Sequence, residues 1–108
     1  MITISLFKDQ NHKVKGFTVE GHAGYGEHGT DIVCAAVTTV TMTTVNGLTD
    51  VVNISLTPEV REGFLSCSLP DKLSETKRRE ADVLLESMVL TLQNLVSQYG
   101  EYIRLQEE

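Results

Sequence analysis

Cys34 and His22 are two side chains of this sequence that could combine into a reactive pair. The glycine-rich segment Gly21-His-Ala-Gly-Tyr-Gly-Glu-His-Gly29 precedes a stretch with helical spacing. Cys34 therefore falls in the first turn of the expected helix, where unpaired backbone N–H groups and the helix dipole favour a thiolate. A thiolate is a nucleophile, and histidine is the usual base for it at neutral pH. The pattern predicts covalent catalysis, in which the same N–H groups would stabilise an oxyanion.

Other residues of this segment leave alternatives open. His28 is closer to Cys34 in sequence than His22 is, which makes it a rival base. Asp31 either orients the histidine or caps the helix, since Asp is a preferred N-cap residue. These two histidines, Asp31 and Cys34 also resemble a zinc ligand set, but zinc sites usually use closely paired ligands such as Cys-x-x-Cys, and the sequence has no such pair. We therefore expect no metal and no cofactor.

A purely structural role is the alternative for each of these residues. A cysteine on a helix is more often a small buried apolar residue than a nucleophile, and Cys67, which shares its parity with Leu65 and Leu69, is expected in the core. Tyr25 either contacts a substrate or anchors the loop. The competing hypothesis for the whole chain is accordingly a non-catalytic binding module, because a small α/β domain can host many functions.

Composition limits the class of protein. The 108 residues correspond to a single domain, 1–108, with 41% hydrophobic and 22% charged residues and a formal charge of −6. An acidic chain lacks the basic surface that nucleic-acid binding requires. The N-terminus lacks the layout of a signal peptide, and we expect no apolar run long enough to cross a bilayer. These features predict a cytoplasmic protein with two free thiols and no membrane or nucleic-acid partner.

Alternating apolar residues predict strands, and apolar residues three and four apart predict helices. Gly16 marks a bulge in the second strand, because the alternation changes phase there. The segment 31–46 is rich in β-branched residues but lacks a strand's alternation, so we predict a helix that Thr30 or Asp31 caps and Gly47 ends. The expected strands are 2–6, 13–21, 52–56, 65–69 and 102–105, with 57–63 joining the third and fourth as a hairpin. The second helix is expected from its cap, Ser74, to its stop at Gly100.

The resulting order, β-β-α-β-β-α-β, predicts an α+β fold. Two amphipathic helices would cover one face of a mostly antiparallel sheet, which is an economical way to bury both apolar surfaces. The other face of the sheet would remain open to solvent or to a partner.

The motif around Cys34 resembles that of the Prp family of ribosomal-processing cysteine proteases. Gly21-His22-Ala23, a glycine-bearing loop and Gly29-Thr-Asp31-Ile-Val-Cys34-Ala-Ala carry the resemblance, which extends less sharply over the whole chain. Twelve positions separate His22 from Cys34, as in the family pattern. The chain departs from the family at Thr38, where the family is associated with Ser, and both residues carry a hydroxyl.

The resemblance implies a His22–Cys34 dyad, with Asp31 part of the motif. It also implies that the enzyme is a homodimer that removes an N-terminal extension from one large-subunit ribosomal protein, the twenty-seventh. Cleavage would follow a hydrophobic stretch ending in Phe and expose a basic N-terminus, which supports ribosome assembly. The loop residues Gly21, Ala23, Gly24, Tyr25, Gly26 and Gly29 would form a mobile segment that rearranges when the substrate binds.

Overall fold

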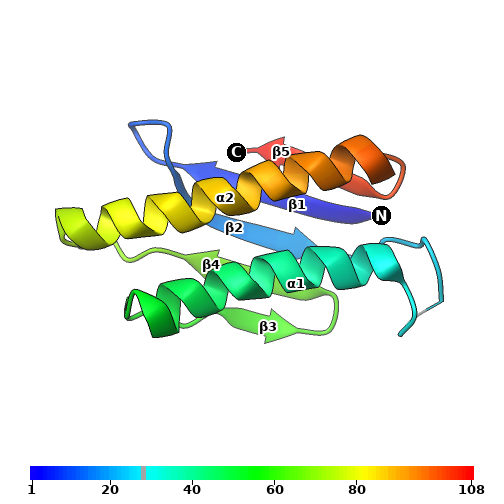
Figure 1. Cartoon of the computed structure of the whole chain (residues 1–108), viewed down its shortest axis with the longest axis horizontal. Coiled ribbons are helices and arrows are strands. Elements are labelled where there is room, and N and C mark those ends of the chain that lie inside the picture. Colours follow the sequence, from blue (N-terminus) through cyan, green and yellow to red (C-terminus); the bar gives the residue numbers. More distant parts are fainter. Residues whose placement is uncertain (28) are drawn as a thin grey trace.

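A computed structural model of the chain describes residues 1–27 and 29–108. The elements in chain order are β1 (Ile2–Lys8), β2 (Val14–Glu20), α1 (Ile32–Asn46), η1 (Gly47–Val51), β3 (Glu59–Arg61), β4 (Phe64–Ser68), α2 (Glu75–Tyr99) and β5 (Ile103–Glu107). Both helices lie side by side over one face of the sheet (Figure 1). The predicted α+β architecture is confirmed.

The sheet has five strands in the order β3-β4-β2-β1-β5. All neighbours are antiparallel except β1 and β5, which pair in parallel and so bring both ends of the chain into one sheet. The predicted bulge in β2 is present: Phe7 pairs with Gly16, whereas Lys8 pairs with Val14, so that Lys15 is the extra residue. This extra residue accounts for the phase change in the apolar pattern.

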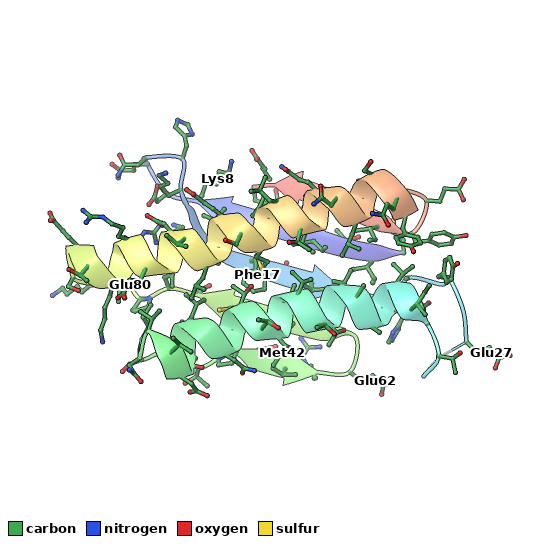
Figure 2. The ribbon with its side chains drawn as sticks, in the orientation of Figure 1. Lys8, Phe17, Glu27, Met42, Glu62 and Glu80 are labelled. Atoms are coloured by element: carbon green, nitrogen blue, oxygen red, sulfur yellow. The ribbon has the colours of Figure 1, made fainter. Side chains whose placement is uncertain are left out.

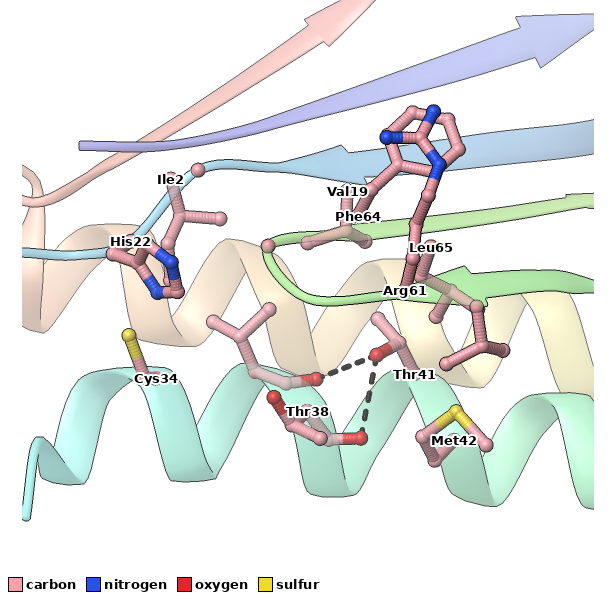
Figure 3. Close-up of a pocket in the computed structure, with 14 residues that line it drawn as sticks. Ile2, Val19, His22, Cys34, Thr38, Thr41, Met42, Arg61, Phe64 and Leu65 are labelled. Carbon is pink, nitrogen blue, oxygen red and sulfur yellow. Dashed lines mark hydrogen bonds between the residues drawn. The ribbon is translucent and has the colours of Figure 1, made fainter. Parts of the chain in front are cut away.

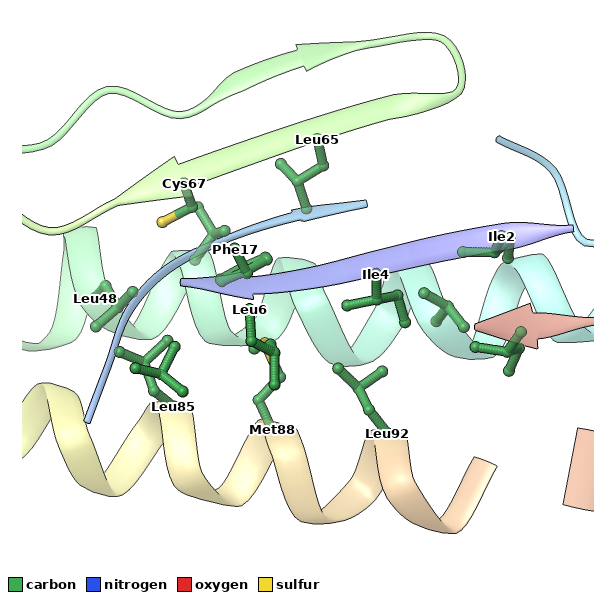
Figure 4. Close-up of a cluster of buried hydrophobic side chains, with 14 of the residues drawn as sticks. Ile2, Ile4, Leu6, Phe17, Leu48, Leu65, Cys67, Leu85, Met88 and Leu92 are labelled. Atoms are coloured by element: carbon green, nitrogen blue, oxygen red, sulfur yellow. The ribbon is translucent and has the colours of Figure 1, made fainter. Parts of the chain in front are cut away.

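The hydrophobic core lies between the sheet and the two helices. Phe17 and Leu6 of the central strands and Leu85 and Met88 of α2 are buried in it (Figure 4). Ser74 caps α2 by accepting a hydrogen bond from the Lys77 N–H, as expected. Cys67 faces the same core, and burial raises the pKa of its thiol to about 11.

Hydrogen bonds to the backbone accommodate the threonine hydroxyls within α1. The hydroxyls of Thr41, Thr43 and Thr44 donate to the carbonyl oxygens four residues earlier, at 2.6 to 3.0 Å. Each such bond satisfies a polar side chain within the helix and leaves the methyl group for packing. The predicted end at Asn46 is correct, but Gly47 has right-handed helical angles and the chain continues through the π-helical turn η1.

Gly47 is the C-cap residue of α1, as predicted, and it also has a packing role. A Cβ atom at this position would lie 2.9 Å from a methyl carbon of Leu84, so glycine allows α2 to approach closely. The predicted strand 52–56 is wrong, because the Ile54 N–H bonds the Leu48 carbonyl at 2.9 Å instead of a strand partner. Its alternation reflects burial of Ile54 beside the helices, and the third strand is β3 instead.

One segment is long and apolar enough to cross a membrane, contrary to the expectation from the sequence. It spans the 20 residues Ile32–Val51 and has a mean hydropathy of 1.4 over its most apolar part. Within the fold, 39% of that apolar part is buried. The length and composition of a single helix are weak evidence for a membrane span, since the core helix of a soluble protein meets the same criterion. Here the segment comprises α1 and η1, which pack against α2.

Candidate active site

His22 follows the end of β2, where two glycines determine its position. Gly21 has a φ of +91°, and a Cβ atom there would lie 2.5 Å from the Met1 carbonyl oxygen. The Gly21 N–H bonds the Gly63 carbonyl at 2.9 Å, which ties this bend to the β3–β4 turn. Gly63 has a φ of +70°, and a Cβ atom there would lie 3.2 Å from His22 Nε2. Glycine is therefore required at both positions for conformation and for space.

Cys34 lies in the first turn of α1, as predicted, and is half-buried. Figure 3 shows its sulfur and the imidazole of His22 pointing toward one another at one end of a hollow. The backbone N–H of Ala23 donates to Cys34 Sγ at 3.2 Å. The structure thus brings together the two side chains that the sequence paired, and adds a backbone donor on the sulfur.

Asp31 is the N-cap of α1 and also an anchor for the glycine loop. Its Oδ1 accepts from the N–H groups of Val33 and Cys34, at 2.9 and 3.0 Å. Its Oδ2 accepts from the N–H groups of Tyr25 and Gly26, at 2.9 and 3.0 Å. A carboxylate offers about four acceptor positions, so these four bonds fill it and favour capping over orientation of His22.

The same contacts change the electrostatics of the site. Burial alone would raise the pKa of Asp31, but the N–H groups of Cys34, Gly26, Tyr25 and Val33 together hold the pKa of this carboxyl below its ordinary value of 3.8. The ionised carboxylate also takes the two first-turn N–H groups that we expected to face the thiolate or an oxyanion. That expectation is wrong for Val33 and Cys34, since both donors are already used.

Tyr25 anchors the loop, which is one of the two roles that the sequence left open. Its ring packs edge-to-face against Tyr99, with centroids 5.7 Å apart, and against Tyr102, with centroids 5.1 Å apart. We call these three rings the tyrosine clasp. Together with Asp31, the clasp holds the loop near Tyr25 and Gly26 in place, so glycine content alone is a poor guide to its motion. His28, the rival base, lies outside the described residues.

An apolar hollow of about 290 Å³ extends from the reactive pair between α1 and the sheet (Figure 3). Val19, Met42 and Phe64 line it, and Leu65 closes it toward the core. Its charged member is Arg61, whose guanidinium lies 4.1 Å above the centre of the Phe64 ring and bonds Glu59 Oε2 at 3.1 Å. The hollow therefore suits large apolar side chains.

A second hollow, of about 700 Å³, shares part of its lining with the first. Gly24, Gly26 and Gly29 of the loop line it together with Asp31 and Glu62. Cys34 and His22 belong to the walls of both hollows, as do Thr38 and Gly63. Figure 2 places Glu27 and Glu62 near this end of the molecule. Cys34 and His22 are therefore accessible from both hollows.

Sequence reasoning missed the wall that β3 and β4 contribute. Gly63, Phe64 and Val60 come from the hairpin, and no motif or spacing connects them with Cys34. Gly63, in the predicted hairpin connection, was the available signal. Its proximity to His22 could be inferred only from the order of the strands in the sheet, in which β4 lies beside β2. Among the described residues, no three His, Cys, Asp or Glu side chains cluster as a metal site.

These features define a class of protein: a half-buried cysteine at a helix start faces a histidine between two substrate-sized hollows, as covalent hydrolysis by a thiol requires. The family model of cysteine protease Prp matches residues 1–104. The chain belongs to this family and is a cysteine protease.

Relatives of known sequence and structure agree with this assignment. The ribosomal processing cysteine protease Prp of Bacillus subtilis is 28% identical over 107 residues, covering 97% of this chain and 96% of that protein. Its counterpart in Staphylococcus aureus is 32% identical over 108 residues, covering 97% of each chain. Crystal structures of S. aureus Prp, with a covalently linked product peptide and with a substrate peptide, superpose with TM-scores of 0.82 and 0.78 at 30% identity, covering both chains completely.

Proposed function

We propose that this protease uses Cys34 as nucleophile and His22 as base to cleave the N-terminal extension from the twenty-seventh protein of the large ribosomal subunit. The observation that carries the proposal is the position of the Cys34 sulfur, which faces His22 where the two hollows meet. Membership of a ribosomal processing family supports the substrate class.

The reaction follows from these positions. His22 accepts the thiol proton, and the thiolate attacks the scissile carbonyl carbon to form a tetrahedral oxyanion. The carbon–nitrogen bond then breaks as His22 returns the proton to the leaving amine, which leaves a thioester on Cys34. Water, deprotonated by His22, attacks the thioester and releases the peptide carboxylate and the free thiol.

The two hollows match the two sides of the expected cleavage site. A hydrophobic stretch ending in Phe suits the apolar hollow lined by Val19, Met42 and Phe64. We assign the basic N-terminus released by the cut to the second hollow, whose lining is also mostly apolar, because the acidic side chains of Asp31 and Glu62 belong to it. A peptide in this direction would place its scissile bond at Cys34.

A homodimer working in the cytoplasm completes the proposal. This part of the proposal is supported by the resemblance of the motif around His22 and Cys34 to the motif of the Prp family. Sedimentation equilibrium of the purified protein tests the first part, because a dimer has twice the 11.9 kDa mass of the chain. A single species at the mass of one chain would contradict it.

The deciding experiment compares Cys34→Ala and His22→Ala with the unaltered protein on a peptide that spans the ribosomal extension, with products identified by mass spectrometry. Each change should nearly abolish cleavage while circular dichroism stays unchanged. His28→Ala is the matched control and should retain cleavage. Cleavage that survives in Cys34→Ala, or that is lost in His28→Ala and retained in His22→Ala, would refute the assignment.

Substrate direction is tested with two altered peptides. Replacing the Phe before the cut by Ala in the peptide should raise KM, because an apolar contact is lost. In the protein, Met42→Asp alters the apolar hollow and should therefore reduce cleavage of the Phe peptide more than cleavage of the Ala peptide. Replacing the lysines after the cut by neutral residues should weaken binding chiefly at low salt. Equal effects of Met42→Asp on both peptides would place the Phe elsewhere.

A further inference from the structure

The donor closest to the nucleophile comes from the backbone of the residue after the proposed base. The Ala23 nitrogen lies 3.2 Å from Cys34 Sγ, with its N–H directed at the sulfur. The donors that a helix start usually offers to an anion are used differently here, since the N–H groups of Val33 and Cys34 donate to Asp31. The Ala23 N–H is therefore in the position to interact with charge on the sulfur.

We propose that the Ala23 N–H is a catalytic hydrogen-bond donor that holds the Cys34 sulfur as the attacking thiolate facing His22. The inference rests on the proposed function, because it requires Cys34 to be the nucleophile. His22 takes the thiol proton, and the Ala23 N–H then faces the negative sulfur without transferring its own proton. Hydrogen bonds to charged groups are about twice as strong as those between neutral groups.

The local structure fixes this donor in place. The side chain of Ala23 is only 3% exposed, so its methyl group is anchored in the core. The peptide bond between His22 and Ala23 is planar, so the N–H keeps a fixed direction relative to the Cα that carries the imidazole. Adjacent residues thus present a side chain and a backbone donor to the same sulfur (Figure 3), which gives Ala23 a chemical as well as a structural role.

Replacing the amide by an ester removes this N–H and leaves the side chain unchanged. The chain can be assembled by joining residues 1–33 to residues 34–108 at the natural Cys34, with lactic acid in place of Ala23. The matched control carries the hydroxy acid analogue of Gln10, in the β1–β2 turn at the opposite end of the molecule from the loop (Figure 1). The Gln10 N–H makes no hydrogen bond within residues 1–27 and 29–108. The all-amide synthetic protein is the reference.

Two rates distinguish the possible outcomes: alkylation of Cys34 by iodoacetamide between pH 6 and 9, and peptide cleavage. The ester at position 23 should slow both at neutral pH by about ten- to a hundred-fold, the usual effect of losing a hydrogen bond to a charged group.

Equal rates for the two esters would overturn the inference. Slow cleavage with unchanged alkylation would also overturn it, by assigning the N–H to the oxyanion instead of the thiolate. If the all-amide protein neither cleaves peptide nor is alkylated at Cys34, the proposed function itself fails.

An amide spectrum tests the same contact if the ester at position 23 does not fold. In ¹⁵N-labelled protein, Cys34→Ala should move the Ala23 amide proton strongly, because its acceptor is removed, and the Gly24 amide proton much less. Shifts of equal size at Ala23 and Gly24 would contradict a specific bond to the sulfur.

Discussion

Replacing Tyr25 by Ala should loosen the glycine loop by a predictable amount. The ring makes two edge-to-face contacts, with Tyr99 and Tyr102, at centroid distances of 5.7 and 5.1 Å. Such pairs contribute about 0.5 to 1.5 kcal/mol each, and the lower half of this range applies because Tyr25 is 45% exposed. Two contacts therefore contribute roughly 1 to 2 kcal/mol to loop closure, which corresponds to about a 5- to 30-fold change in the open population.

Hydrogen exchange of the Gly26 amide measures that population directly. This N–H donates to Asp31 Oδ2 at 3.0 Å, so it exchanges when the loop leaves the carboxylate. Tyr25→Ala should speed its exchange by roughly the same 5- to 30-fold factor. Tyr25→Phe is the matched control, since it retains the ring and should exchange like the unaltered protein.

The reasoning fails if Gly26 exchanges at the same rate in Tyr25→Ala as in the unaltered protein. If Tyr25→Phe exchanges as fast as Tyr25→Ala, the hydroxyl holds the loop and the ring packing does not. Adding substrate peptide tests the separate prediction that the loop rearranges on binding, because exchange at Gly26 should then slow. No change on binding would contradict that prediction.

Three further outcomes follow from contacts at the site. Asp31→Asn should lower the free energy of unfolding measured in urea at pH 7. Because the pKa of Asp31 in the folded protein lies below 3.8, this difference in stability should persist above pH 3.8 and vanish as the pH falls through the folded-state pKa. A difference that does not depend on pH would contradict this prediction. Gly63→Ala should cost about 1 kcal/mol for its left-handed backbone and lower kcat by displacing His22, and unchanged kcat would count against that contact. At pH 8 iodoacetamide should modify Cys34 well before Cys67, whose pKa is about 11, and equal labelling in native protein would refute the burial argument.

Local sequence patterns predicted most of the architecture because most elements are defined by short-range signals. Asp31 and Ser74 were recognisable as caps, and the bulge beside Gly16 was visible as a change of phase. The site was accessible only in part: a cysteine at a helix start suggests a nucleophile, but the residues alone left both His22 and His28 open as its base, and the family resemblance favoured His22.

The predictions that failed depend on contacts between elements. Ile54 alternates with its neighbours as in a strand, but its N–H bonds Leu48, and only the folded helix shows that. Gly47 was recognisable as the end of α1, but its close approach to Leu84 of α2 is invisible in sequence. The loss of the first-turn donors at Cys34, in contrast, was implied by the predicted cap, because an N-cap Asp accepts from these N–H groups.

The tyrosine clasp has a consequence for the order in which the protein is made. A ribosome synthesises the chain from the N-terminus, so His22, Cys34 and α1 emerge well before Tyr99 and Tyr102. Until those residues leave the exit tunnel, Tyr25 has no clasp and β1 lacks β5, its parallel neighbour. In a nascent chain, the loop between His22 and Cys34 would therefore lack the contacts of Tyr25 with Tyr99 and Tyr102. These contacts can form only after the segment that carries both tyrosines has been synthesised.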